Sequence, residues 1–160
     1  MALRRSIAIL EDDSRRRVEM FRLLDDRLYM YNIVWFRTAS EMIDWFKAQS
    51  VPPILTCLDH DLEDTDIPAG TGRQVANFLV EQFGSNEFPV ILHSSNDPAR
   101  TGMAELLHQH DWKYSEAVPY DDVAWIAETW FPSVKRALRG VSKKPRASSV
   151  KSPTELRQPS

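Results

Sequence analysis

The chain reads PILTCLDHDLED from residue 53 to residue 64, and this stretch is the most informative part of the sequence. Its first half is a short apolar run typical of a buried strand, and its second half gathers carboxylates around one histidine. Packing a core gives no reason to place charges there, because burying an unpaired charge is costly. The pattern therefore predicts a strand that delivers Asp59, His60 and Asp61 to a rim where function should be sought.

Two other stretches have the same form. An apolar run at 6–10 ends in the acids of 11–13, and a second run at 88–92 ends in HSSN at 93–96. Each of the three runs is followed by residues with helical spacing of apolar side chains. If the three strands are parallel neighbours, their carboxyl ends meet in one crevice, which is where open α/β sheets bind ligands.

Five strands and five helices are expected to alternate along the chain. The strands are predicted at 6–10, 32–36, 54–58, 88–92 and 116–118, and the helices at 14–28, 39–49, 73–83, 98–110 and 121–138, the last interrupted at Pro132. Short connections between alternating elements favour an α/β fold, a doubly wound parallel sheet with helices on both faces.

Composition divides the chain into one globular domain, residues 1–140, and a tail, residues 141–160. The tail holds five basic residues and one acid, so its net charge is +4 and that of the domain is −7, against −3 for the whole chain. It has almost no large apolar residues and is predicted to be disordered. An acidic domain repels bare nucleic acid, so a polynucleotide ligand would need a metal ion, the tail or a basic patch such as 15–17.

The sequence predicts a cytoplasmic protein with no membrane partner. No apolar stretch approaches bilayer length, and the first residues are too acidic for a signal peptide. Cys57 is the only cysteine, which excludes an internal disulfide and indicates a buried apolar role.

These residues resemble a response-regulator receiver domain over about 5–139. In that resemblance Asp12 and Asp13 are the acidic pair, Asp59 is the phosphoacceptor and Ser94 is the small hydroxyl residue. The resemblance implies a flavodoxin-like, five-stranded sheet with strand order 2-1-3-4-5. It departs at one place, because receivers carry a lysine before a proline at the end of strand five and this chain has Val118.

A variant of that fold, the cyclic-phosphate processing receiver family, is a closer resemblance. It pairs LDHDL, here 58–62, with a His-Ser-x-Asn motif, here 93–96, and with a methionine in the next helix, here Met103. The resemblance implies action on cyclic phosphate ends of RNA or on cyclic nucleotides, in repair or defence. It suggests a magnesium-dependent cyclic phosphodiester hydrolase.

Three aspartates are predicted to hold the metal ion. Asp12, Asp13 and Asp59 are hard oxygen donors that repel one another unless a cation lies between them. Mg²⁺ is the expected cofactor, with Mn²⁺ as the alternative, because Mg²⁺ keeps waters and bridges to phosphate. Asp13 has a second interpretation as the N-cap of the first helix.

His60 and His93 are predicted to form the acid–base pair. Opening a cyclic phosphodiester needs a base for water and an acid for the departing ribose oxygen, and imidazole serves both near neutral pH. Which histidine is the base stays open. Asp61 is expected to orient a histidine or to join the metal ligands.

Phosphate oxygens are expected to bind at Ser94, Ser95 and Asn96, with help from the amides that open the following helix. Ser94 has an alternative role as a simple cap.

A non-catalytic receiver-like binding or signalling module is the alternative to the enzyme. An ordinary phosphorelay receiver is disfavoured because its coupling lysine is missing. The expected ligand is a cyclic-phosphate RNA end or nucleotide, and receiver-like domains also suggest a homodimer.

Overall fold

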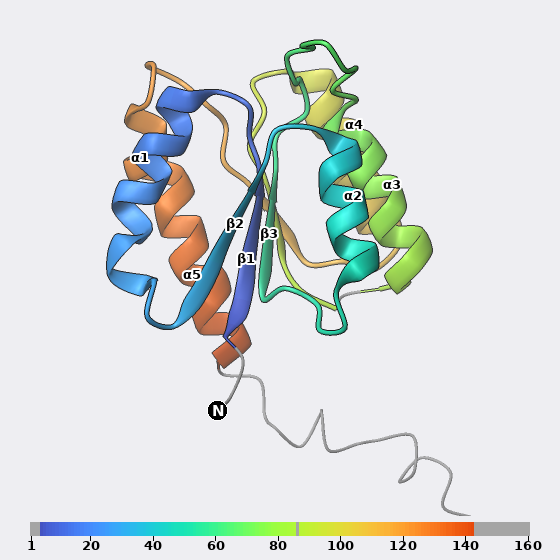
Figure 1. Ribbon diagram of the computed structural model, residues 1–160, viewed down its shortest axis with the longest axis horizontal. Helices are drawn as coiled ribbons and strands as arrows, with labels where there is room; N and C mark the ends of the chain where they lie inside the picture. The colour runs from blue at the N-terminus through green and yellow to red at the C-terminus, as the bar shows by residue number, and fades with distance from the viewer. Residues whose placement is uncertain (1–3, 86, 143–160) are drawn as a thin grey trace, which may run out of the picture.

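The computed structural model describes residues 4–85 and 87–142 (Figure 1). Five parallel strands form one sheet in the order β2-β1-β3-β4-β5. Along the chain they are β1 (Arg5–Leu10), β2 (Tyr31–Phe36), β3 (Leu55–Leu58), β4 (Val90–Leu92) and β5 (Tyr114–Glu116). The predicted doubly wound parallel sheet and its strand order are confirmed.

Helices cover both faces of this sheet (Figure 1). One face carries α1 (Ser14–Leu24) and α5 (Phe131–Ser142), and the other carries α2 (Ala39–Ala48), α3 (Gly72–Phe83) and α4 (Asp97–Gln109). A short 3₁₀ turn, Asp25–Arg27, follows α1 and takes the place of the last turn predicted for that helix.

Two hydrophobic cores lie on the two faces because side chains alternate along a strand. Leu58 of β3 packs with α2, α3 and α4, whereas the preceding Cys57 packs with α1 and α5. The same alternation holds in β1 and β4, whose residues are in register with those of β3. Consecutive residues at the strand tips therefore belong to opposite faces.

Caps and one glycine fix the helix starts near the rim. Asp13 and Asn96 cap α1 and α4 through hydrogen bonds from Arg16 N and Ala99 N. Gly72 opens α3 directly against β3, and a Cβ there would lie 1.9 Å from the carbonyl oxygen of Asp59. Only glycine permits this approach.

Two predicted elements are placed differently in the structure. β5 lies two residues earlier than expected because its register is set by pairing with β4, where Leu92 faces Glu116. The last helix does not start at Asp121, which lies in a turn with φ 44°. Instead a π-helical turn, Ile126–Trp130, precedes α5, and Pro132 lies in the first turn of α5, where proline is tolerated.

The predicted domain boundary at residue 140 lies close to the end of α5. The disordered tail predicted for 141–160 falls, beyond residue 142, outside the described residues. No helix in 4–85 or 87–142 has the length and apolar character needed to cross a membrane.

Candidate functional site

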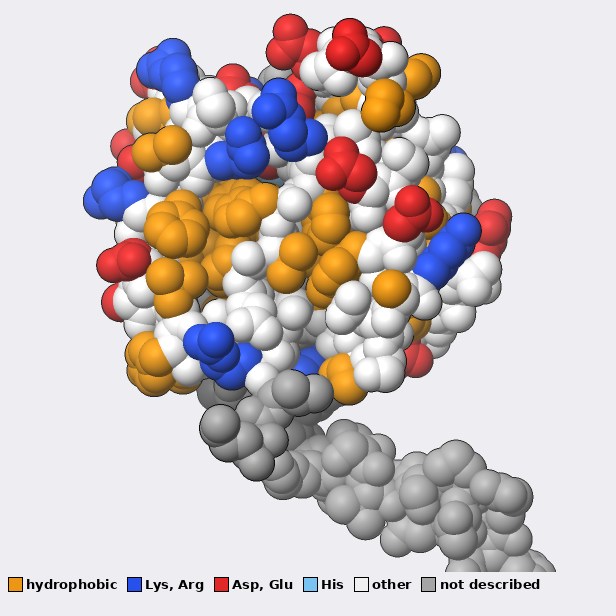
Figure 2. Space-filling view, viewed as in Figure 1, with side chains coloured by type: hydrophobic (Ala, Val, Ile, Leu, Met, Phe, Trp, Pro, Cys, Tyr) orange, Lys and Arg blue, Asp and Glu red, His pale blue; other side chains and the backbone are white. Residues whose placement is uncertain are grey.

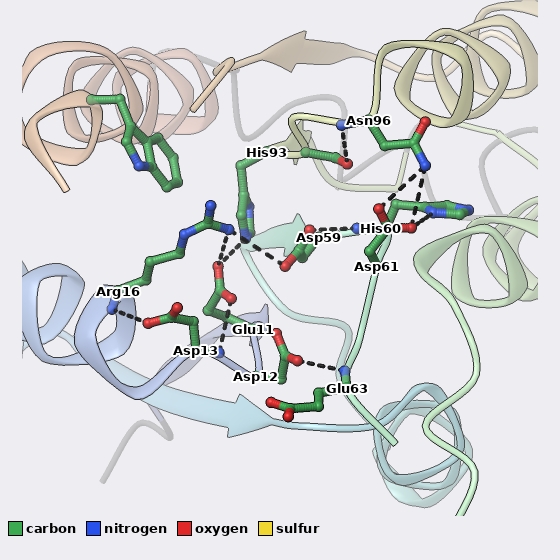
Figure 3. A network of polar contacts seen from close by, with 12 residues as sticks. Glu11, Asp12, Asp13, Arg16, Asp59, His60, Asp61, Glu63, His93 and Asn96 are labelled. Carbon is green, nitrogen blue, oxygen red and sulfur yellow. Dashed lines mark hydrogen bonds and ion pairs between the residues drawn. The ribbon is translucent and has the colours of Figure 1, made fainter. Parts of the chain in front are cut away.

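Glu11, Asp59 and His93 come together because each is the first residue beyond one of three neighbouring strands. The last residues of β1, β3 and β4 are level in the sheet. The amides of Asp59 and His93 continue the ladder by donating to carbonyls of the adjacent strands at 3.1 and 2.9 Å. Alternation then turns all three side chains towards α1 and α5. Figure 3 shows them converging above the strand ends.

The three side chains form a buried polar cluster whose ligand atoms lie within 4.8 Å of one another. Glu11 and His93 are 0% exposed and Asp59 is 4% exposed. His93 Nε2 lies 3.2 Å from Glu11 Oε1. Within the described residues, Glu11 Oε1 and both nitrogens of His93 lack a partner with hydrogen-bond geometry. Leaving such a buried group unpartnered costs roughly 1–3 kcal/mol, so the cluster favours an additional ligand.

The surroundings of the cluster shift the pKa values of Asp59 and Glu11 in opposite directions. Burial, followed by the negative charge of Glu11, raises the pKa of Asp59 to about 9. Burial alone would also raise the pKa of Glu11, but the His93 imidazole, the Asp13 amide and the Arg16 guanidinium together hold it below its ordinary value. Without a bound cation the pair therefore retains one proton near neutral pH.

Arg16 supplies the positive charge that faces this cluster. Its guanidinium comes from α1 and lies 3.6 Å from Glu11 and 3.7 Å from Asp59. It also stacks over the ring of Trp125, with 5.3 Å between the guanidinium carbon and the ring centroid. The His93 ring stacks on the same tryptophan at 5.9 Å. Arg16 therefore places a positively charged side chain beside the buried carboxylates, in a chain that has Val118 where the receiver resemblance implies a lysine.

The two aspartates predicted beside Asp59 as metal ligands have other partners here. Asp12 Oδ2 accepts a hydrogen bond of 2.5 Å from the amide of Glu63, and burial raises the pKa of Asp12. Asp13 is exposed and caps α1 through Oδ1. Neither residue belongs to the group of ligand atoms that lie within 4.8 Å of one another, although Asp12 interacts with the Glu11 carboxyl group. Metal binding by Asp12 and Asp13 stays a prediction.

His60 is held at the rim by the carboxylate that follows it. His60 Nδ1 lies 2.7 Å from Asp61 Oδ1, and the Asn96 amide donates to both oxygens of Asp61 at 3.2 and 3.3 Å. The contact with His60 lowers the pKa of Asp61 most, and the hydrogen bonds from Asn96 lower it further. His60 is one residue beyond Asp59, so its ring points away from His93 (Figure 3). The structure does not bring the two imidazoles together.

The serines of the HSSN motif differ in exposure. Ser94 is buried, and its Oγ accepts a hydrogen bond of 3.1 Å from Asn96 N, while its carbonyl accepts one from Arg100. Ser95 is exposed. Met103 is fully buried in the core beneath α4. Ser95 and Asn96 are therefore the members of this motif that a ligand can reach directly.

Acidic side chains dominate the loop between β3 and α3, which borders the cluster. Glu63, Asp64 and Asp66 are exposed there, and Figure 2 shows acidic side chains gathered over this loop. Lys and Arg side chains cover the neighbouring part of the same end, beside the loop. The acidic side attracts cations and the basic side attracts anions.

The fold is that of receiver domains, as three solved structures show. The phosphorylated cyanobacterial phytochrome response regulator RcpA matches with a TM-score of 0.66 and 17% identity, over 85% of this chain and 95% of that one. The receiver domain of a putative LuxO repressor from Vibrio parahaemolyticus gives 0.62 and 20%, over 88% and 94%. A CheY-like receiver from Methanospirillum hungatei JF-1 gives 0.61 and 14%, over 89% and 100%.

A family model described as "Cyclic-phosphate processing Receiver domain" matches residues 7–109. The chain belongs to this family, and the resemblance found in the sequence is confirmed. None of the curated proteins compared with the chain matched it. At this end of the sheet the Glu11, Asp59 and His93 side chains could together hold a metal ion.

The site predicted from the sequence did not include Glu11, Arg16 or Trp125. A signal for Glu11 was present, because residues 11, 59 and 93 are each the first residue after a predicted strand. Nothing in the local sequence distinguishes Arg16 from Arg15 and Arg17, since its role depends on how α1 packs over the sheet.

Proposed function

We propose that the protein hydrolyses cyclic phosphodiesters, of the kind found at RNA ends and in cyclic nucleotides, with the help of a divalent metal ion. One observation carries this proposal. An oriented histidine–carboxylate pair, His60 and Asp61, stands at the same end of the sheet as a buried cluster of two carboxylates and an imidazole. Membership of the cyclic-phosphate processing family supports the same substrate class.

His60 is the group we assign to proton transfer. The Asp61 carboxylate can only accept a hydrogen bond, so it favours the tautomer in which His60 Nδ1 carries the proton. Nε2 of the neutral ring is then free to act as a base. Asn96 fixes Asp61 from the other side. The side chain of His60 keeps 17% of its surface exposed, whereas His93 has none, so His60 is the imidazole that a substrate can reach.

The proposed reaction consumes one water molecule. The water oxygen forms a bond to phosphorus while the bond from phosphorus to one ribose oxygen breaks. His60 Nε2 takes a proton from the water, and the imidazolium returns a proton to the departing ribose oxygen. The product is a phosphomonoester, and the ring ends in its starting state. The sequence prediction divided these two transfers between His60 and His93, whereas we assign both of them to His60.

The remaining groups hold the phosphate. A divalent ion bound among the carboxylates would stabilise the negative charge that develops on the phosphate oxygens. Ser95 and the Asn96 side chain lie at the start of α4, where amide groups favour anions. Ser94 is buried and its Oγ accepts a hydrogen bond from Asn96 N, so we assign Ser94 to shaping this turn; its phosphate contact stays a prediction.

Turnover of defined substrates tests the proposal. Untagged protein is incubated with 2′,3′-cyclic nucleotides and with RNA carrying a 2′,3′-cyclic end, with Mg²⁺ or Mn²⁺ and with EDTA in a parallel reaction. We expect hydrolysis that requires the metal, and a loss of about 10²- to 10⁴-fold in kcat/KM for His60→Gln. His108→Gln, an exposed histidine on α4, serves as the matched control.

Undiminished turnover in both His60→Gln and His93→Ala would refute the assignment of proton transfer to these histidines. Binding of a cyclic nucleotide without turnover would support the alternative, a non-catalytic receiver-like module. That alternative is favoured by Arg16, which already pairs with both buried carboxylates. Stable labelling of Asp59 by a small phosphodonor would instead indicate a phosphorelay receiver.

A further inference from the structure

We infer that the metal ion of this site is a first-row transition-metal ion rather than Mg²⁺, and that His93 is one of its ligands beside Glu11 and Asp59. This ion is the one that the proposed function requires, but its identity can be tested without any substrate. The arrangement differs from the aspartate-only set that the receiver resemblance implies.

The spacing of the ligand atoms suits one shared ion. Two ligands that each lie about 2.1 Å from a metal are separated by about 3.0 Å in octahedral and about 3.4 Å in tetrahedral geometry. The observed distance from His93 Nε2 to Glu11 Oε1 is 3.2 Å, between these values. The Asp59 carboxylate lies within 4.8 Å of both and completes the set after a small rotation or through one water.

The chemistry of the ligands selects the metal. Mg²⁺ prefers six oxygen ligands and is rarely bound by nitrogen, whereas imidazole together with carboxylates suits Zn²⁺, Fe²⁺ and related ions. Replacing one oxygen donor of a receiver site by His93 therefore disfavours Mg²⁺. The fourth and further positions remain available to water or to a phosphate oxygen, as in catalytic metal sites.

An independent observation comes from hydrogen bonding. His93 is 0% exposed, and its Nε2 points into the cluster without making a hydrogen bond to the carboxylate that it touches. Glu11 Oε1 is likewise buried without such a partner. Of the three cluster atoms without a hydrogen bond, which are Glu11 Oε1 and the two nitrogens of His93, Oε1 and Nε2 lie 3.2 Å apart. A metal ion between them would satisfy both at once.

Arg16 explains how two carboxylates remain close together before an ion binds. The guanidinium lies against both of them, and 23% of its side chain is exposed, so it can move towards solvent. An incoming divalent ion repels this charge and takes over its two carboxylate partners. The released guanidinium stays near Trp125, at the edge of the site, where it can pair with a phosphate oxygen.

Electron spin echo spectroscopy of bound Mn²⁺ tests whether an imidazole is a ligand. The chain has four histidines, so the triple variant His60→Gln/His108→Gln/His110→Gln, prepared without a tag, leaves His93 as its one imidazole. We expect ¹⁴N modulation from a coordinated nitrogen in the wild type and in the triple variant. His93→Gln should lose this modulation. Zn²⁺ should displace Mn²⁺ at a concentration at least about 10-fold lower than Mg²⁺ requires.

Asp12→Asn is the control, because it removes a ligand of the aspartate-only site and should leave the modulation intact. Three results would overturn the inference: no ¹⁴N modulation in the triple variant, no binding of Mn²⁺ at all, or equal displacement by Zn²⁺ and Mg²⁺. The triple variant tests His93 as a ligand even if His93→Gln fails to fold. A protein that shows the modulation but no turnover would contradict the proposed function and leave the metal assignment intact.

Discussion

Replacing Asp59 by asparagine should stabilise the metal-free protein, and the gain should grow with pH. The pKa of Asp59 is raised to about 9 in the folded protein, against 3.8 for an ordinary aspartate. Between these values the folded state holds a proton that the unfolded state has released. Stability that is present below pH 3.8 is therefore lost as the pH rises towards 9.

The magnitude follows from the slope of about 1.4 kcal/mol per pH unit that one proton gives. Between pH 5 and pH 8 the wild type should lose up to about 4 kcal/mol relative to Asp59→Asn, and we expect roughly 2–4 kcal/mol after partial solvation of the cluster. The lowered pKa of Glu11 does not oppose this trend, because its contribution is complete above its unfolded value near 4.5. Asparagine keeps the oxygen that accepts from the His60 amide.

Equilibrium urea unfolding, followed by tryptophan fluorescence in EDTA at pH 5, 6, 7 and 8, measures this difference. Asp44→Asn, an exposed aspartate on α2, controls for the substitution itself. A gain for Asp59→Asn that stays constant with pH, or that is below about 0.5 kcal/mol at pH 8, would show that no buried proton is held there. Saturating Mn²⁺ should remove the dependence, because the ion replaces the proton.

Three further substitutions have specific expected outcomes. Arg16→Gln should bind Mn²⁺ about 10-fold more tightly in titrations at low salt, because a competing positive charge is removed. The same variant should bind inorganic phosphate more weakly. Unchanged affinity for both ligands would contradict the role given to this guanidinium. Gly72→Ala should lower the free energy of unfolding by roughly 1–3 kcal/mol and abolish turnover, since its Cβ would clash with a backbone carbonyl of β3. Gly140→Ala, where a Cβ meets nothing within 4 Å, should not be destabilised, and equal melting shifts would argue against a clash. Asn96→Ala should cost about 1 kcal/mol as a lost N-cap and also reduce kcat/KM, whereas Thr38→Ala, which removes the N-cap of α2, should cost the same stability with full activity.

Most of the fold could be predicted because strands and helices alternate with clear periodicity and each buried strand ends in polar residues. The predicted position of β5 differs by two residues from the observed one. Tyr114 to Glu116 is a polar edge strand without alternation, and its register depends on pairing with β4. The predicted start of the last helix is wrong because Asp121 and Asp122 adopt positive φ angles, which no local sequence pattern reveals.

The candidate site was only partly predictable. The sequence singled out Asp59, His60 and His93 because they follow predicted strands, but it did not predict which of their side chains lie together. Position along the chain brings His60 and His93 to the same rim, whereas the direction of each side chain depends on register and alternation. Arg16 needed the packing of α1 over the sheet, which is a tertiary property.

The opposite orientation of neighbouring tip residues limits the shape of any molecule that uses both parts of the site. The buried carboxylate cluster faces α1 and α5, whereas His60 lies on the side of α3, with the ends of β3 and β4 between them (Figure 3). On the proposed function, a substrate must straddle these two strand ends and present its phosphorus to both sides.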